Sequence, residues 1–151
     1  MPAPATLTGQ DVGEAEGALT ALLNQILTSS NMGITRTEYI TLRVLALRGP
    51  APAPAELHDY LASQPQLGLD RPQVAELLRG LEAEGLVTGS AAGAGPTQLT
   101  PEGAALHARL AEAVAAVTRR LYAGLDPDDL ATTHRVLAEI TERARRLRDQ
   151  P

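Results

Sequence analysis

Residues 70–87, DRPQVAELLRGLEAEGLV, decide the fold because their pattern predicts a short amphipathic helix that leads directly into a strand. The apolar residues of this stretch recur at helical spacing and form one face: Val74, Leu77, Leu78 and Leu81. Asp70 is placed to cap the helix, and Gln73 stands where a capping box has Glu or Gln. Gly85 suits the left-handed position that ends a helix, and the next two residues are typical of a strand.

Three further helices are predicted upstream of this stretch. Apolar spacing predicts a long first helix over 11–30, and Thr35 with Glu38 forms a capping box that starts the second helix. Gly49 and Pro50 end that second helix, and a short third helix is expected over 55–62.

A hairpin and two long helices are predicted downstream. Two strand residues at 87–88 and two at 98–99 flank a Gly-rich loop, which indicates a hairpin. Because this loop has no side chain that would anchor it, we expect residues 90–96 to be among the most mobile of the free protein. Thr100 and Pro101 open the first long helix, and Asp126 caps the last one.

Composition excludes several classes of protein. The chain has 151 residues, a net charge of −5, no cysteine and only 2% aromatic residues, and all of its 13 Lys/Arg positions are arginine. Cysteine-based metal sites and disulfides are therefore impossible, and aromatic platforms for single-stranded nucleic acid are excluded. No apolar run is long enough for a membrane span and no signal peptide is apparent, so we expect a soluble cytoplasmic protein.

The long terminal helices predict a homodimer. Each is roughly 30 Å long at the helical rise, so it overhangs the small central block and leaves its apolar stripe without a partner. We therefore expect a disordered N-terminus over 1–10, dimerisation helices over 11–33 and 101–148, and a central domain over 34–100. The residues expected in the dimer interface are Leu19, Leu22, Leu137 and Ile140.

The order of these elements resembles the MarR family of bacterial transcription regulators. Residues 33–39, GITRTEY, resemble the family's entry into its second helix, and residues 55–57, AEL, resemble the start of its helix-turn-helix. The pattern over 74–87 fits its recognition helix, and residues 99–103, LTPEG, resemble its exit from the wing. The resemblance implies a mainly helical fold with a small β-hairpin: a winged helix-turn-helix flanked by N- and C-terminal dimerisation helices.

The resemblance also implies double-stranded DNA as the partner. The residues at the corresponding positions of the recognition helix and wing are Arg71, Gln73, Arg79, Ser90, Thr97 and Gln98. For the two arginines the alternative is a solvated surface role, and for Gln73 it is the capping box alone.

Other positions depart from the family pattern. The loop SAAGAGPT at 90–97 lacks the charged residues that the family usually carries there, and residues 35–100 hold five arginines against seven carboxylates. Because DNA affinity depends largely on neutralised phosphates, we expect weak binding with few ionic contacts. The alternative is a MarR-like dimeric protein-interaction module that has lost DNA binding.

A small-molecule effector is implied by the same resemblance. The candidate pocket residues lie at the junction between the dimer helices and the winged block, with ordinary core and surface roles as the alternative: Tyr39, Arg43, His107 and Tyr122.

The three histidines have no metal-ligand spacing, and no catalytic set is apparent, so we predict no enzyme, metal or cofactor. Four arginines near the C-terminus are expected to complement the helix dipole, with a patch for nucleic acid or an acidic partner as the alternative: Arg143, Arg145, Arg146 and Arg148.

Overall fold

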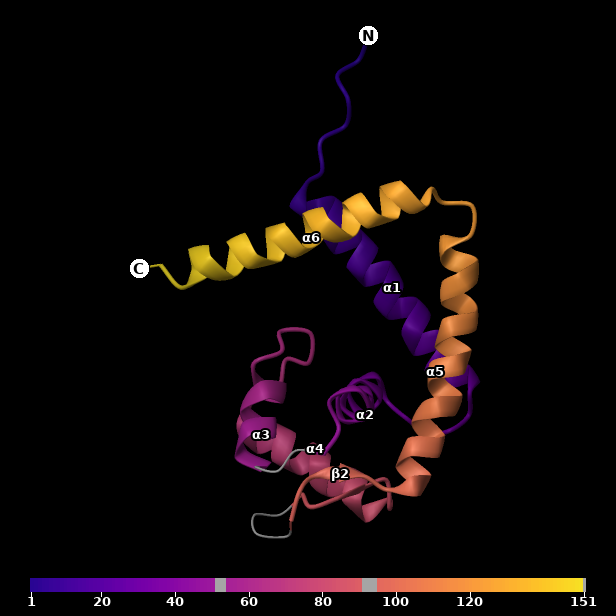
Figure 1. Ribbon diagram of the computed structural model, residues 1–151, viewed down its shortest axis with the longest axis vertical. Coiled ribbons are helices and arrows are strands. Elements are labelled where there is room, and N and C mark those ends of the chain that lie inside the picture. Colours follow the sequence, from indigo (N-terminus) through magenta and orange to yellow (C-terminus); the bar gives the residue numbers. More distant parts are fainter. Residues whose placement is uncertain (51–53, 91–94, 151) are drawn as a thin grey trace. The chain divides into compact units, whose positions relative to one another are not determined.

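The computed structural model describes residues 1–50, 54–90 and 95–150. This part of the chain forms six helices and one two-stranded antiparallel hairpin (Figure 1), and the predicted fold class is confirmed. The elements in chain order are α1 (Gly9–Ser29), α2 (Arg36–Arg48), α3 (Pro54–Ala62), α4 (Arg71–Ala83), β1 (Val87–Thr88), β2 (Gln98–Leu99), α5 (Pro101–Tyr122) and α6 (Pro127–Arg148).

Capping boxes fix the starts of α1, α2 and α4. In each box the capping side chain accepts a hydrogen bond from the third helical N–H, and the third side chain accepts one in return. The boxes predicted at Thr35 and Asp70 are present. A third box, at Thr8 and Asp11, starts α1 at Gly9, so this helix begins two residues before its predicted start.

The chain divides into two compact units, Met1–Ala115 and Ala116–Pro151. The first unit contains α1 to α4, the hairpin and the first turns of α5. It extends past the expected central domain 34–100 because Leu106 and Leu110 of α5 are buried in its core. Leu27 of α1 is also buried there, so residues outside 34–100 help to complete this unit.

An aliphatic core holds the first unit together. Leu42, Leu61 and Leu78 are fully buried and come from α2, α3 and α4, so the core joins the three helices of the predicted central domain. A buried leucine side chain contributes about 1.5–3 kcal/mol relative to an exposed one. We expect the truncation of any of these three leucines to leave a cavity and to destabilise the whole unit.

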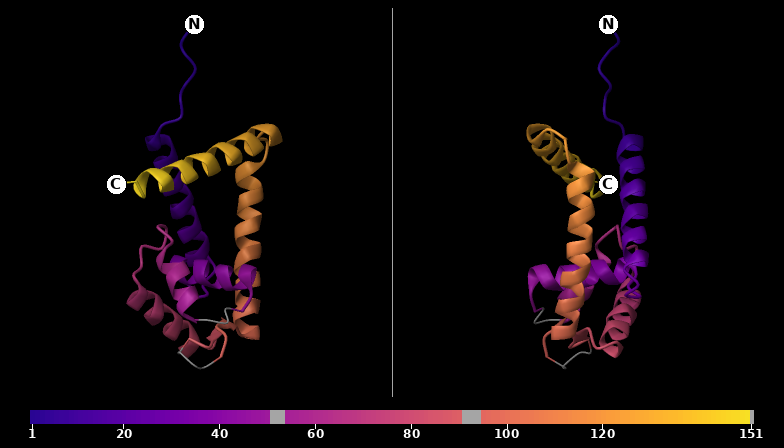
Figure 2. Two further views of the ribbon diagram at one scale, coloured as in Figure 1. Left: turned by 60° about the vertical axis from the view of Figure 1, so that its left-hand side comes forward. Right: turned by 90° about the vertical axis from the view of Figure 1, so that its right-hand side faces the viewer.

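The hairpin begins directly at the end of α4. Gly85 has a φ of 76°, which lets the backbone turn out of the helix, and β1 pairs with β2 in the register Val87 to Leu99. The Thr100 hydroxyl donates to the Gly85 carbonyl oxygen at 2.6 Å. A Cβ on Gly103 would lie 2.0 Å from the Leu86 carbonyl oxygen, so only glycine allows α5 to pack here. These contacts explain the residues LTPEG at 99–103, and Figure 2 shows the hairpin beside the start of α5.

The second unit carries an apolar stripe that the single chain leaves exposed. No described residue of α6 is buried, and the exposed fractions of Leu137 and Ile140 are 38% and 42%. In the first unit, the exposed fraction of Leu19 is 44% and Leu22 is partly exposed. Within the described residues, no helix combines the length and the apolar character that a membrane crossing requires.

Candidate nucleic-acid interface

Arg71 lies at the start of α4 and is paired across to α3. Its Nε atom is 2.9 Å from Oδ1 of Asp59, and both side chains are more than half exposed. An exposed pair of this kind contributes at most about 1 kcal/mol, so a phosphate can replace the carboxylate. Arg71 is therefore accessible to DNA, but its ion pair with Asp59 must break before it can bind a phosphate.

Arg79 is also accessible and also paired. It lies two turns further along α4 and forms an ion pair with Glu76, three residues before it on the same helix. Its side chain is 62% exposed. Both arginines of the predicted recognition helix are thus partly neutralised by carboxylates of the same winged block.

Gln73 serves as a helix cap. Its side-chain oxygen accepts from the Asp70 N–H at 2.9 Å, while its own N–H donates to Asp70 Oδ1 at 2.8 Å. A glutamine that reads adenine uses both ends of its amide. Such a contact by Gln73 would therefore require the cap to open.

Ser90 and Thr97, which were predicted to contact DNA, are buried in this structure. Thr97 is fully buried and its hydroxyl donates to the Gly89 carbonyl oxygen at 2.7 Å. Ser90 is also buried, and its hydroxyl donates to the Glu82 carboxylate. Both hydroxyls are used to close the base of the hairpin, whereas Gln98 on β2 is exposed.

Glu82 ties the hairpin to α4, a role that sequence reasoning missed. Its carboxylate accepts from the Gly89 N–H at 3.1 Å as well as from Ser90. Gly89 has a φ of 75°, and a Cβ there would lie 2.2 Å from the Pro96 carbonyl oxygen. The sequence signal for this role was the spacing of Gly89, which lies seven residues after Glu82 and eight residues before Thr97.

The tip of the loop, residues 91–94, lies outside the described residues, so its mobility stays a prediction.

Three of the four predicted pocket residues, Tyr39, Arg43 and His107, belong to the first unit. The rings of Tyr39 and His107 stack with centroids 6.0 Å apart, and Tyr39 is buried. Burial and then the Arg43 charge lower the pKa of His107, while burial raises the pKa of Tyr39 against the opposing effect of Arg43. Tyr122 belongs to the second unit, where its exposed fraction is 42%.

His107 also lines a hollow that the sequence did not predict. This hollow has a volume of about 270 Å³, and the His107 Nε2 atom is buried without a hydrogen-bond partner. The lining residues come from the end of α2, from β2 and from the start of α5: Leu45, Ala46, Gly49, Pro50, Gln98, Leu99, Ala104 and His107.

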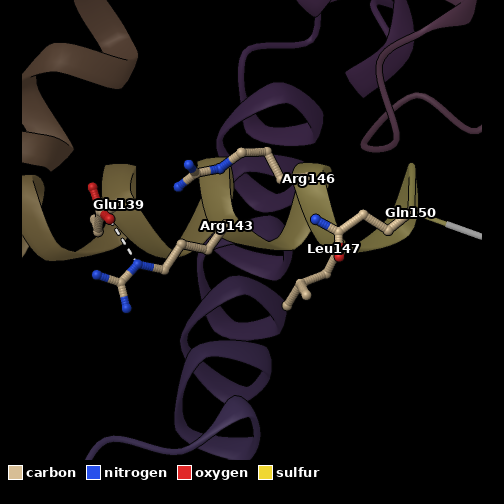
Figure 3. A pocket seen from close by; sticks show the side chains of 5 residues that line it. All are labelled: Glu139, Arg143, Arg146, Leu147 and Gln150. Carbon is tan, nitrogen blue, oxygen red and sulfur yellow. Dashed lines mark hydrogen bonds and ion pairs between the residues drawn. The ribbon is translucent and has the colours of Figure 1, made fainter.

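The C-terminal arginines lie on α6 and are mostly paired. Arg143 Nε is 2.6 Å from Glu139 Oε1, and Arg148 Nε is 3.1 Å from Asp149 Oδ1. A surface hollow of about 400 Å³ is lined only by side chains from the C-terminal part of the chain, including Arg143 and Arg146 (Figure 3). These local pairs favour the interpretation that the arginines stabilise the end of α6.

Metal binding finds no support in the described part of the chain, where no group of three His, Cys, Asp or Glu side chains is arranged to hold an ion. His58 on α3 has a buried Nε2 without a hydrogen-bond partner. Burial and then the Arg71 charge lower the pKa of His58, with Asp59 acting in the opposite direction, so its imidazole is neutral near pH 7.

Comparison with known proteins gives matches among solved structures. The sequence matches no protein-family model and no curated protein. The transcriptional regulator PA3341 is 27% identical, with 91% of this chain and 98% of that chain covered and a TM-score of 0.72. NadR in complex with 4-hydroxyphenylacetate is 26% identical, with 91% and 96% covered and a TM-score of 0.71. The Mycobacterium tuberculosis MarR family protein Rv2887, in complex with salicylic acid, is 25% identical, with 92% and 99% covered and a TM-score of 0.63.

Proposed function

We propose that this chain, which has the MarR-family winged helix fold, acts as a homodimeric DNA-binding transcriptional regulator in the cytoplasm. The observation that carries the proposal is α4, whose exposed face presents Arg71 and Arg79 and whose end is tied to a hairpin. The likeness to the transcriptional regulator PA3341 over more than nine tenths of both chains supports it. In this proposal residues 34–100 bind DNA, and residues 11–33 and 101–148 form the dimer.

The charges of the described residues support a mode of binding with few ionic contacts. In a winged helix the recognition helix lies in the major groove, so α4 would place Arg71 and Arg79 near phosphates or guanine edges. The part of the hairpin loop that would reach the neighbouring groove carries no charge. The recognition helix therefore has to supply most of the affinity.

A small-molecule effector is part of the proposal. NadR and Rv2887 were solved with 4-hydroxyphenylacetate and salicylic acid, which are both small aromatic acids. Tyr39, Arg43, His107 and Tyr122 are the residues first expected to bind an effector in this chain. The stacking of Tyr39 on His107, with the Arg43 charge acting on both, supports the first three of them.

The test is DNA binding across a salt series. The DNA upstream of the protein's own coding region is titrated with wild type, Arg79→Ala and the control Arg145→Ala, which removes the same charge from α6. A dimer that uses both copies of Arg71 and Arg79 should give a slope of log affinity against log salt of about −4 or shallower. Arg79→Ala should weaken binding by roughly 1–3 kcal/mol if Arg79 contacts a guanine, and Arg145→Ala should have little effect.

Two results would contradict the proposal in different ways. No binding even at about 50 mM salt would favour the alternative, an interaction module that has lost DNA binding. A steep slope that is insensitive to Arg79→Ala would place the ionic contacts elsewhere, for instance on Arg36, Arg48 or the C-terminal arginines.

A further inference from the structure

Arg36, the first residue of α2, is an enclosed arginine in an unfavourable place. Its side chain is 23% exposed, whereas those of Arg71 and Arg79 are 58% and 62% exposed. The start of a helix is the positive end of its dipole, so a cation there is repelled. Because a charged side chain is rarely enclosed without partners, other groups must hold Arg36 in this position.

The two partners of Arg36 belong to different elements of the first unit. Its Nη1 atom donates to the backbone carbonyl oxygen of Gln66 at 3.0 Å. Its Nη2 atom is 4.0 Å from Oε1 of Glu16 on α1. The guanidinium is planar and rigid, so the position of one partner restricts the position of the other. Arg36 therefore joins α1, the start of α2 and the chain that follows α3.

Gln66 lies in the turn of residues 63–70, which connects α3 to α4. Leu67 of this turn is buried in the core, and its N–H donates to the Gln64 carbonyl oxygen at 3.0 Å. Asp70 ends the turn and caps α4. Because this turn leads directly into the cap, the hydrogen bond from Arg36 restrains the chain four residues before α4 is capped.

Glu16 is oriented by its own helix. The Thr20 hydroxyl donates at 2.8 Å to the same Oε1 atom that lies near Arg36. The Glu16 side chain is 65% exposed, so its ion pair with Arg36 contributes little to stability. Its effect is on orientation, because a shift of α1 would move the carboxylate that one end of the guanidinium faces.

We propose that Arg36 is a positioning residue that couples α1 to the recognition helix α4 through the turn before α4. Residues 11–33 are expected to contribute to the dimer, so the contact connects a helix of the proposed dimer interface with the helix of the proposed DNA interface. A movement of α1 that withdraws Glu16 leaves the guanidinium less restrained, and the turn loosens with it. The inference rests on the proposed function, since it names a way in which the dimer helices regulate DNA binding.

Direct contact with a DNA phosphate is the alternative role of Arg36, and salt dependence separates the two. Each lost phosphate contact makes the slope of log affinity against log salt shallower by about 0.9, which gives about 1.8 for two protomers. A residue that only positions α4 changes the affinity and leaves the slope as it was. The enclosed side chain and its two internal partners favour positioning.

The experiment compares wild type with Arg36→Met, Arg36→Lys and Glu16→Gln in the full chain. Arg36→Met removes both contacts but keeps an unbranched side chain, and Arg36→Lys keeps the charge. Glu16→Gln removes the charge and keeps an oxygen for Thr20. The matched controls are Arg109→Met, at an exposed position of α5 in the first unit, and Glu14→Gln, at an exposed position of α1. Thermal unfolding followed by circular dichroism shows which variants are folded.

Amide exchange without DNA is the first readout. We expect the Leu67 N–H to exchange roughly tenfold faster in Arg36→Met and roughly two- to threefold faster in Glu16→Gln, because the turn loses restraint. Arg36→Lys should lie between wild type and Arg36→Met, since an ammonium cannot hold both partners in one fixed geometry. The Leu61 amide of α3 should be unchanged, as should all amides of the turn in the two controls.

A double variant and DNA binding complete the test. Glu16→Gln combined with Arg36→Met should match Arg36→Met alone, because both residues act through one contact. Arg36→Met should lower the DNA affinity roughly three- to tenfold with an unchanged salt slope, and Arg36→Lys should restore part of this loss.

Three results would overturn the inference: unchanged exchange at Leu67 in folded Arg36→Met, equal exchange in Glu16→Gln and Glu14→Gln, or a slope shallower by about 1.8 in Arg36→Met. If Arg36→Met does not fold, Arg36→Lys and Glu16→Gln carry the same test. Unchanged exchange in a chain that binds DNA would remove the coupling and leave the proposed function intact. Faster exchange at Leu67 in a chain that binds no DNA would support the coupling and contradict the regulator function.

Discussion

At the scale of single residues, the ion pair of Arg71 with Asp59 should limit how freely the proposed recognition helix α4 can contact phosphate. The two atoms are 2.9 Å apart, and both side chains are well exposed. Coulomb attraction between exposed charges is modest, so the pair acts as a competitor for DNA and contributes little to stability. If Arg71 contacts DNA as proposed, the ion pair affects DNA binding, because the pair is present in the chain without DNA and would have to break in the complex.

Asp59→Asn should therefore tighten DNA binding. Releasing Arg71 in both protomers should raise the affinity roughly two- to tenfold at low salt and steepen the salt dependence. The matched control is Glu56→Gln on the same helix, which removes one negative charge without releasing an arginine seen paired in the described residues. Binding is measured by fluorescence anisotropy with labelled DNA. Equal gains in both variants would show that only the net charge matters.

Residue roles were predictable where they depend on neighbours in the sequence. The capping pair Asp70 and Gln73 was predicted because the two residues are three positions apart, and the structure contains both hydrogen bonds. The buried state of Ser90 and Thr97 was not predictable, because it depends on Glu82 and on the meeting of two strands. A small hydroxyl residue in a Gly-rich loop suits a surface as well as a buried turn, and only the three-dimensional packing decides between them.

At the scale of elements, hydrogen bonds connect α4 to the base of the hairpin. Glu82 holds Gly89 and Ser90, and Gly89 holds Thr97 through its carbonyl oxygen. The close approach of Gly89 to Pro96 leaves no room for a side chain at this crossing. The base of the hairpin, which includes Gly89, Ser90 and Thr97, is therefore held in place by these contacts.

Glu82→Ala should loosen the attachment of the hairpin to α4. The Gly89 N–H and the Ser90 hydroxyl would lose their acceptor in a partly buried place, at a cost of about 1–3 kcal/mol in unfolding free energy. The conservative variant Glu82→Gln keeps an oxygen for the Gly89 N–H and should lose less. Amide exchange should become faster at Gly89 in Glu82→Ala, with α4 still protected. Unchanged protection at the Gly89 amide would show that the carboxylate does not hold the hairpin.

Elements themselves were largely predictable, because their ends carry local signals. The residues at 99–103 were assigned to the exit from the wing by resemblance alone, and the structure supplies the reason in the contacts of Thr100 and Gly103 with the end of α4. The hollow at His107 was beyond prediction, since its walls come from two stretches of the chain, residues 45–50 and 98–107, that are far apart in the sequence.

At the scale of the whole molecule, the terminal helices present apolar surface that one chain does not cover. The exposed fractions of Leu137 and Ile140 on α6 and of Leu19 on α1 lie between 38% and 44%. Scattered exposed leucines are common, but these recur at helical spacing along helices of 21 and 22 residues. A second copy of the chain offers the same apolar surface, which is the basis of a symmetric interface.

Leu137→Asp should separate the proposed dimer, because it would place an unpaired charge in the expected apolar interface at a cost of several kcal/mol. The control Thr132→Asp adds the same charge to an exposed position of α6 away from the stripe. Light scattering at micromolar concentration should give twice the 15.8 kDa chain mass for wild type and for the control, and a smaller mass for Leu137→Asp. Leu137→Asp should also lose most of its DNA affinity although α4 is untouched, because a dimer gains from contacting two half-sites at once. A wild-type monomer at 15.8 kDa would contradict the dimer and, with it, the two-site mode of DNA binding.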